Sequence, residues 1–177
     1  MNKAHRIFIP ALVLPLMFLG TEAVSQELQP GQLLPELTAE ERAARGAANA
    51  QAMALWFIVQ ARQQDHSITD AGRAAGEFFA QGWPAELTPA HFVRAANGNW
   101  QMWGARTEVL EVSDRHVTAR RDRKPTREDF AGSWADVTLE DFEAFMRGIY
   151  VAITEARGLS YSETVEDDHI VFTVSME

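Results

Sequence analysis

The chain has 177 residues, of which 46% are hydrophobic, 23% charged and 10% aromatic, and it has no cysteine and a formal net charge of −9. These values fit a single folded domain and exclude a disulfide-stabilised miniprotein, a coiled coil and a disordered tail. The acidic balance also argues against nucleic acid as a partner, because such binding depends largely on neutralising phosphates.

The N-terminal residues have the composition of a secretory signal. Basic residues precede an apolar run over residues 7–19, and small residues follow it. The pattern predicts a signal peptide over residues 1–23, cleaved after Ala23, with cleavage after Ser25 as the alternative. Because the run is shorter than the roughly 20 residues that cross a bilayer, we expect a periplasmic or secreted mature chain without stable membrane insertion. An uncleaved N-terminal anchor is the competing interpretation.

Three helices are predicted after an extended lead over residues 24–37. Thr38-Ala39-Glu40-Glu41 fits a capping box and starts a helix that should run to about Arg62. A second helix is expected over residues 68–81, where Gly72 and Gly76 share one face and allow another helix to approach closely. Thr88-Pro89 starts a third helix, and Asn97-Gly98-Asn99 is expected to bend or end it.

The second half of the chain combines alternating and helical patterns. Residues 107–113 and 116–121 predict a hairpin with Leu110 and Val112 on one face and Val109 on the other. Residues 139–157 predict an amphipathic helix, and residues 159–165 and 170–176 predict a second hairpin. The order indicates a single α+β domain over residues 38–177. It has three N-terminal helices, then hairpin-helix-hairpin forming a mainly antiparallel four-stranded sheet covered by helices. The strand order stays open.

Several short stretches resemble a known group of small α+β domains. They are residues 70–83, which begin Asp-Ala-Gly-Arg and end Gly-Trp, the run Asn99-Trp100-Gln101-Met102-Trp103-Gly104, and Gly158-Leu159 before the last hairpin. This layout resembles the group that includes 4-vinyl-reductase-like and L-2-amino-thiazoline-4-carboxylate-hydrolase-like proteins. The resemblance implies a pocket for a small organic ligand between helices and sheet. The hydrolase-like members are expected to use cysteine, which this chain lacks, so that activity is not carried over.

Two features suggest where a ligand would bind. Aromatic residues are frequent at positions expected to face the core, and ligand pockets favour such walls with a few polar groups. Five basic residues also occur within residues 120–127, and guanidinium groups can hold a carboxylate or phosphate with two hydrogen bonds. The competing interpretations are a solid aromatic core and a solvated loop. The candidate ligand-binding residues are Trp56, Trp83, Trp100, Trp103, Phe145, Arg121 and Arg123.

The sequence thus favours an exported domain that binds a small, partly apolar molecule, with an anionic group as a further expectation. No metal is predicted, because no two histidines lie three or four residues apart, and no cofactor is predicted, because the sequence has no Walker loop and no dinucleotide-binding glycine motif. One alternative is a hydrolase- or isomerase-type enzyme that uses carboxylates, His91, His116 or Arg121. The other is a protein-interaction module that uses residues 24–37 or an exposed helix face. The ligand and the oligomeric state stay open.

Overall fold

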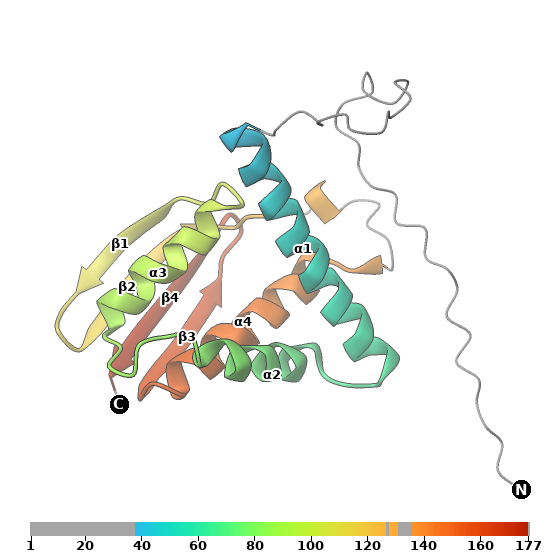
Figure 1. Ribbon diagram of the computed structural model, residues 1–177. Helices are drawn as coiled ribbons and strands as arrows, with labels where there is room; N and C mark the ends of the chain where they lie inside the picture. Colours follow the sequence, from blue (N-terminus) through green and yellow to red (C-terminus); the bar gives the residue numbers. More distant parts are fainter. Residues whose placement is uncertain (1–37, 127, 131–135, 177) are drawn as a thin grey trace, which may run out of the picture. The chain divides into compact units, whose positions relative to one another are not determined.

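The computed structural model describes residues 38–126, 128–130 and 136–176, and the predicted signal peptide and extended lead lie outside these residues. The described part is an α+β domain, as predicted (Figure 1). Its elements, in chain order, are α1 (Ala39–Gln63), α2 (Ile68–Ala80), α3 (Pro89–Gln101), β1 (Thr107–Val112), β2 (His116–Asp122), the short 3₁₀ helix η1 (Glu128–Phe130), α4 (Leu139–Glu155), β3 (Leu159–Val165) and β4 (His169–Met176). Within the described residues, no helix has the length and apolar character needed to cross a membrane.

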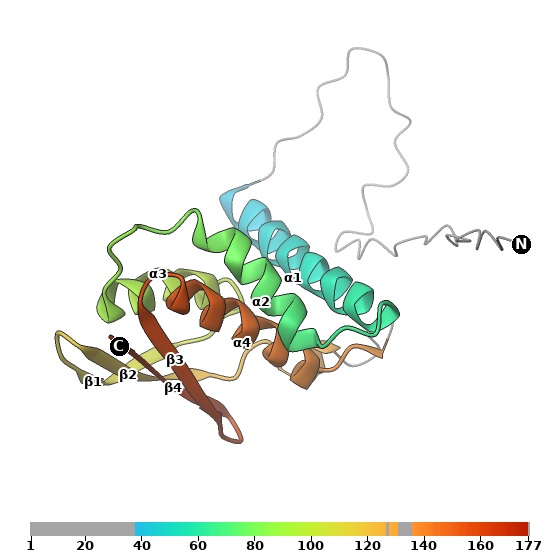
Figure 2. The ribbon, with the colours of Figure 1, turned by 90° about the horizontal axis from the view of Figure 1, so that it is seen from below.

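The four strands form one antiparallel sheet in the order β1-β2-β4-β3. Helices α3 and α4 lie on one face of this sheet, and α1 and α2 lie farther out (Figure 2). Alternate residues of a strand point to opposite faces, so β2 directs Val117, Ala119 and Arg121 toward the helices, where all three are buried. The same alternation therefore buries an arginine at the end of a central strand.

Helices α2 and α4 touch through their backbones. A Cβ atom added at Gly72 would collide with the carbonyl group of Phe145, and one added at Gly148 would collide with the backbone of Thr69. Only glycine permits so close an approach at these positions. The predicted role of Gly72 and Gly76 as a face for close helix packing is confirmed, since a Cβ atom at Gly76 would likewise meet the backbone of α4.

The predicted end of the third helix is wrong. Helix α3 continues through Asn97-Gly98-Asn99 to Gln101. The continuation places Phe92, Ala96 and Trp100 on one side at intervals of four residues, and all three are buried. Burial of that side outweighs the cost of roughly 1 kcal/mol for a glycine within a helix.

The predicted faces of β1 are also wrong. The register shifts between Val109 and Glu111, so Val109 pairs with Ala119 and Val112 pairs with Val117. The bulge inserts one residue into the strand and puts Val109 and Val112 on the same face. Trp56 was expected near the core, but it is 52% exposed on α1. The helix buries its opposite side, where Leu55 and Ile58 lie.

Candidate functional site

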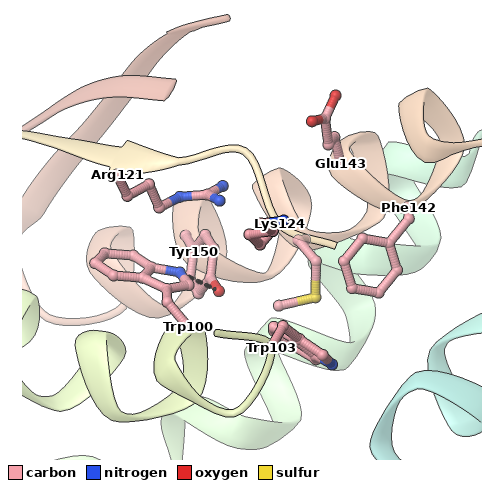
Figure 3. Close-up of a pocket in the computed structure, with 8 residues that line it drawn as sticks. Trp100, Trp103, Arg121, Lys124, Phe142, Glu143 and Tyr150 are labelled. Atoms are coloured by element: carbon pink, nitrogen blue, oxygen red, sulfur yellow. Dashed lines mark hydrogen bonds between the residues drawn. The ribbon is translucent and has the colours of Figure 1, made fainter. Parts of the chain in front are cut away.

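A small hollow lies between the end of α3, the end of β2 and the first half of α4 (Figure 3). Its lining residues combine aromatic walls with charged groups. They are Trp100, Trp103, Arg121, Lys124, Phe142, Glu143, Met146 and Tyr150. We call this set the hollow and take it as the candidate ligand site.

Arg121 is the unusual residue of the hollow, because its charge is buried and no described residue forms an ion pair with it. The residue is 5% exposed, and its Cζ lies 5.4 Å from the centre of the Trp100 ring. Its Nε has no hydrogen-bond partner, and no described residue forms a hydrogen bond or an ion pair with the side chain. The attraction between the Arg121 guanidinium and the Trp100 ring offsets only part of the free-energy cost of removing the cation from water. The guanidinium is therefore free to accept an anionic partner.

The Tyr150 hydroxyl supplies a second hydrogen-bond donor to the hollow. Trp100 Nε1 lies 2.7 Å from the Tyr150 oxygen, and an indole N–H can only donate. The hydroxyl therefore accepts this bond and keeps its own proton, for which no described residue provides an acceptor. Burial raises the pKa of Tyr150 to about 12, so the hydroxyl stays protonated at neutral pH.

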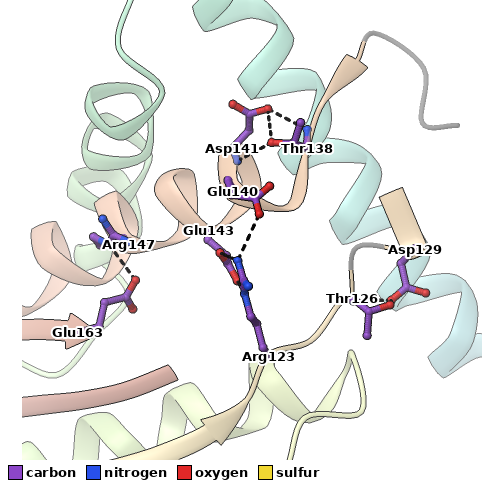
Figure 4. Close-up of polar contacts among 9 residues, drawn as sticks. All are labelled: Arg123, Thr126, Asp129, Thr138, Glu140, Asp141, Glu143, Arg147 and Glu163. Atoms are coloured by element: carbon purple, nitrogen blue, oxygen red, sulfur yellow. Dashed lines mark hydrogen bonds and ion pairs between the residues drawn. The ribbon is translucent and has the colours of Figure 1, made fainter. Parts of the chain in front are cut away.

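Glu143 contributes a negative charge that is paired with Arg123, and Arg123 also lies 3.5 Å from the exposed Glu140 carboxylate. Arg123 Nε lies 2.6 Å from Glu143 Oε1 and Arg123 Nη2 lies 2.8 Å from Glu143 Oε2 (Figure 4). The hydrogen bonds to Glu143 raise the pKa of Arg123 above its usual value. A two-bond pair of this kind fixes both side chains. The uncompensated charge of the hollow is therefore that of Arg121, with the exposed Lys124 ammonium at its edge.

The room inside the hollow is about 10 Å³, which holds roughly one water molecule. An open cleft of about 650 Å³ lies beside it. Lys124 lines both spaces, and Arg123 of the cleft is bonded to Glu143 of the hollow. The other cleft residues are mostly polar: Arg106, Asp122, Thr126, Leu139, Asp167, Asp168 and His169. The hollow can thus admit the end of a molecule whose remainder lies in the cleft.

The structure brings together three of the seven candidate ligand-binding residues, since Trp100, Trp103 and Arg121 all line the hollow. Arg123 lies next to them through its bonds with Glu143. The basic run from which these arginines come is divided, because the neighbouring Arg120 points away and pairs with Glu108.

The remaining three candidates lie elsewhere. Trp83 stacks on Phe92, with ring centres 5.3 Å apart. Phe145 stacks on Phe57 of α1, with ring centres 6.0 Å apart, and Trp56 is on the same helix. None of the three lines the hollow.

The sequence analysis missed the residues that α4 contributes. Phe142, Met146 and Tyr150 recur every four residues and so line one side of the helix. The amphipathic pattern that predicts a helix over residues 139–157 includes Phe142 and Met146 in its apolar stripe, and one further step of four residues adds Tyr150. Glu143 carries no comparable signal, because its role depends on Arg123 from a distant part of the chain.

The histidines of the described residues do not line the hollow. His91 is exposed on α3, and His116 contacts Ser113 and Glu111 at the β1–β2 turn. His169 lines the cleft rather than the hollow. A search of protein-family models found no match to this sequence, and no curated protein matches it significantly.

Proposed function

We propose that this chain is an exported, periplasmic domain that binds a small, partly apolar molecule with an anionic group. The observation that carries the proposal is the buried Arg121 guanidinium, which has no partner among the described residues and faces the hollow. Buried charges in folded proteins are normally paired. An unpaired one at the wall of a cavity is what a site for an anionic ligand requires.

The surroundings of Arg121 support the partly apolar character of the ligand. Trp100, Trp103 and Phe142 supply aromatic surface on the sides of the hollow, and ligand sites combine such walls with a small number of oriented polar groups. The cleft beyond Lys124 is of ligand size. The export half of the proposal rests on residues 1–23 of the sequence alone.

Mass spectrometry of the protein under native conditions, after purification without extraction, tests the proposal. We expect a bound small molecule, or, after its removal, quenching of tryptophan fluorescence by carboxylates, sulfonates or phosphate monoesters that carry an apolar group. The quenching should be reduced in Trp100→Phe, whose side chain lines the hollow together with Trp103, and kept in Trp56→Phe, whose side chain is exposed. A protein that carries no bound molecule and responds to no compound of this panel would refute the proposal.

A further inference from the structure

We infer that the hollow is the head-group site for a single carboxylate, bound by the Arg121 guanidinium and the Tyr150 hydroxyl. The apolar part of the ligand lies against the aromatic residues of the hollow, and any further polar part lies in the cleft beyond Lys124. This inference rests on the proposed function and names the chemical class of its ligand. It depends on three features of the hollow: its charge, its hydrogen-bond donors and its size.

The charge of the hollow matches a monoanion. Arg121 forms no ion pair with a described residue, whereas Glu143 is paired with Arg123, which also lies 3.5 Å from the exposed Glu140 carboxylate. A monoanion therefore neutralises the buried guanidinium. A dianion such as a phosphate monoester adds a surplus negative charge beside the Glu143 carboxylate, where low polarity makes the repulsion costly. Lys124 offsets little of this repulsion, because its ammonium is exposed and screened by water.

The hydrogen-bonding groups of the hollow favour an acceptor without protons of its own. The free groups are the Arg121 N–H donors and the Tyr150 proton. An ionised carboxylate accepts all of these bonds, whereas the NH₂ of an amide opposes a donor. Trp103 Nε1 is also buried without a partner, but Figure 3 shows it at the end of its ring away from Arg121, so it is outside the head-group site.

The size of the hollow favours a flat head group. Room of about 10 Å³ holds one oxygen-sized group, so the walls must separate to admit both oxygens of a carboxylate. A planar three-atom carboxylate requires a smaller separation than a tetrahedral sulfonate or phosphate. The planar guanidinium also matches the two oxygens of a carboxylate with parallel N–H bonds.

Calorimetric titration of matched compounds tests the inference. The probes are cinnamate and hexanoate, their amides, and cinnamyl phosphate, each added to the purified protein after removal of any bound molecule. We expect the better of the two acids to bind at least about tenfold more tightly than its amide and than cinnamyl phosphate, which is the usual cost of leaving a charged group without its hydrogen bonds.

Four variants locate the effect. Arg121→Met should abolish the preference for acid over amide, and Arg121→Lys, which keeps the charge but not the planar fork, should retain part of it. Tyr150→Phe should weaken binding of the acid several-fold and leave binding of the amide unchanged. Arg120→Met is the matched control, because Arg120 lies at the adjacent position with its side chain on the surface, and it should bind as the unmodified protein does. If Arg121→Met does not fold, the reduced preference for acid over amide expected in Arg121→Lys tests the role of Arg121.

The possible failures are distinguishable. Equal binding of acid and amide, or an acid preference that survives both Arg121 variants, would overturn the carboxylate inference and leave the proposed ligand-binding function standing. Preferential binding of cinnamyl phosphate would do the same. No binding of any probe, together with no co-purified molecule, would overturn both.

Discussion

Replacing Arg121 with methionine should stabilise the ligand-free protein. Methionine retains an unbranched chain of similar length and can fill the same space over the Trp100 ring. The substitution removes a guanidinium that is 5% exposed and has an unpartnered Nε. The folded state then no longer contains a cation that has lost water without gaining a counter-ion.

The expected gain follows from two opposing effects. An unsatisfied buried donor costs about 1–3 kcal/mol, and more when the group is charged. The contact between Arg121 and the Trp100 ring, at 5.4 Å, returns about 0.5–2 kcal/mol. The difference predicts that the free energy of unfolding rises by about 1–2 kcal/mol in Arg121→Met. For a protein of this size, such a gain raises Tm by about 2–8 °C.

Urea denaturation of both proteins, after removal of any bound molecule, measures this difference. The slope of unfolding free energy against urea should be the same for both. Arg120→Met controls for the substitution itself and should stay within about 0.5 kcal/mol of the unmodified protein, because the Arg120–Glu108 pair is on the surface. An Arg121→Met protein less stable than its parent by about 1 kcal/mol would show that the rings satisfy the guanidinium, and the argument for an anion at this position would then fail.

Three further outcomes are expected. Gly72→Ala should destabilise the protein by about 1–3 kcal/mol, because its Cβ meets the backbone of α4. Gly46→Ala, in open space on α1, should stabilise it by up to about 1 kcal/mol. Urea denaturation measures both changes. Folding raises the pKa of Tyr150 from 10.0 to about 12, and burial raises that of Tyr161 as well. The contribution of Tyr150 to stability is therefore full below pH 10 and is lost as the pH rises through about 12. Alkaline titration should show tyrosinate absorbance only on unfolding, and absorbance in the folded protein at pH 10 would contradict this. Expression of the full sequence in a bacterium should give a periplasmic protein whose intact mass lacks residues 1–23, and an uncut chain in the membrane fraction would favour the anchor.

The helices and hairpins could be predicted because their signals are local. Thr38 and Thr138 both form the capping boxes that start α1 and α4, and alternation in β4 matches its buried residues. Two local predictions failed for nonlocal reasons. Burial of Trp100 extends α3 past Gly98, and pairing with β2 creates the bulge near Leu110.

The candidate site could be predicted only in part. Trp100 and Arg121 were identified by residue type. The alternation of residues along β2, which buries Arg121, can also be read from the sequence. The sequence did not show which arginines of the basic run lie near the hollow and which lie on the surface. That depends on the partners that the fold supplies, which are Glu143 for Arg123 and Glu108 for Arg120. The strand order that places β2 beside β4 likewise follows from packing across the whole domain.

The glycine contact between α2 and α4 determines which wall of the hollow can move. Helix α4 carries Glu143 and Tyr150. Its backbone is in direct contact with the backbone of α2, so α4 cannot move toward α2. Admission of a guest larger than water must therefore displace the other walls, which are formed by Trp100 and Trp103 near the end of α3 and by Lys124 after β2. Changes in hydrogen exchange caused by an occupant should accordingly concentrate around these residues, while the amides of α4 keep their protection.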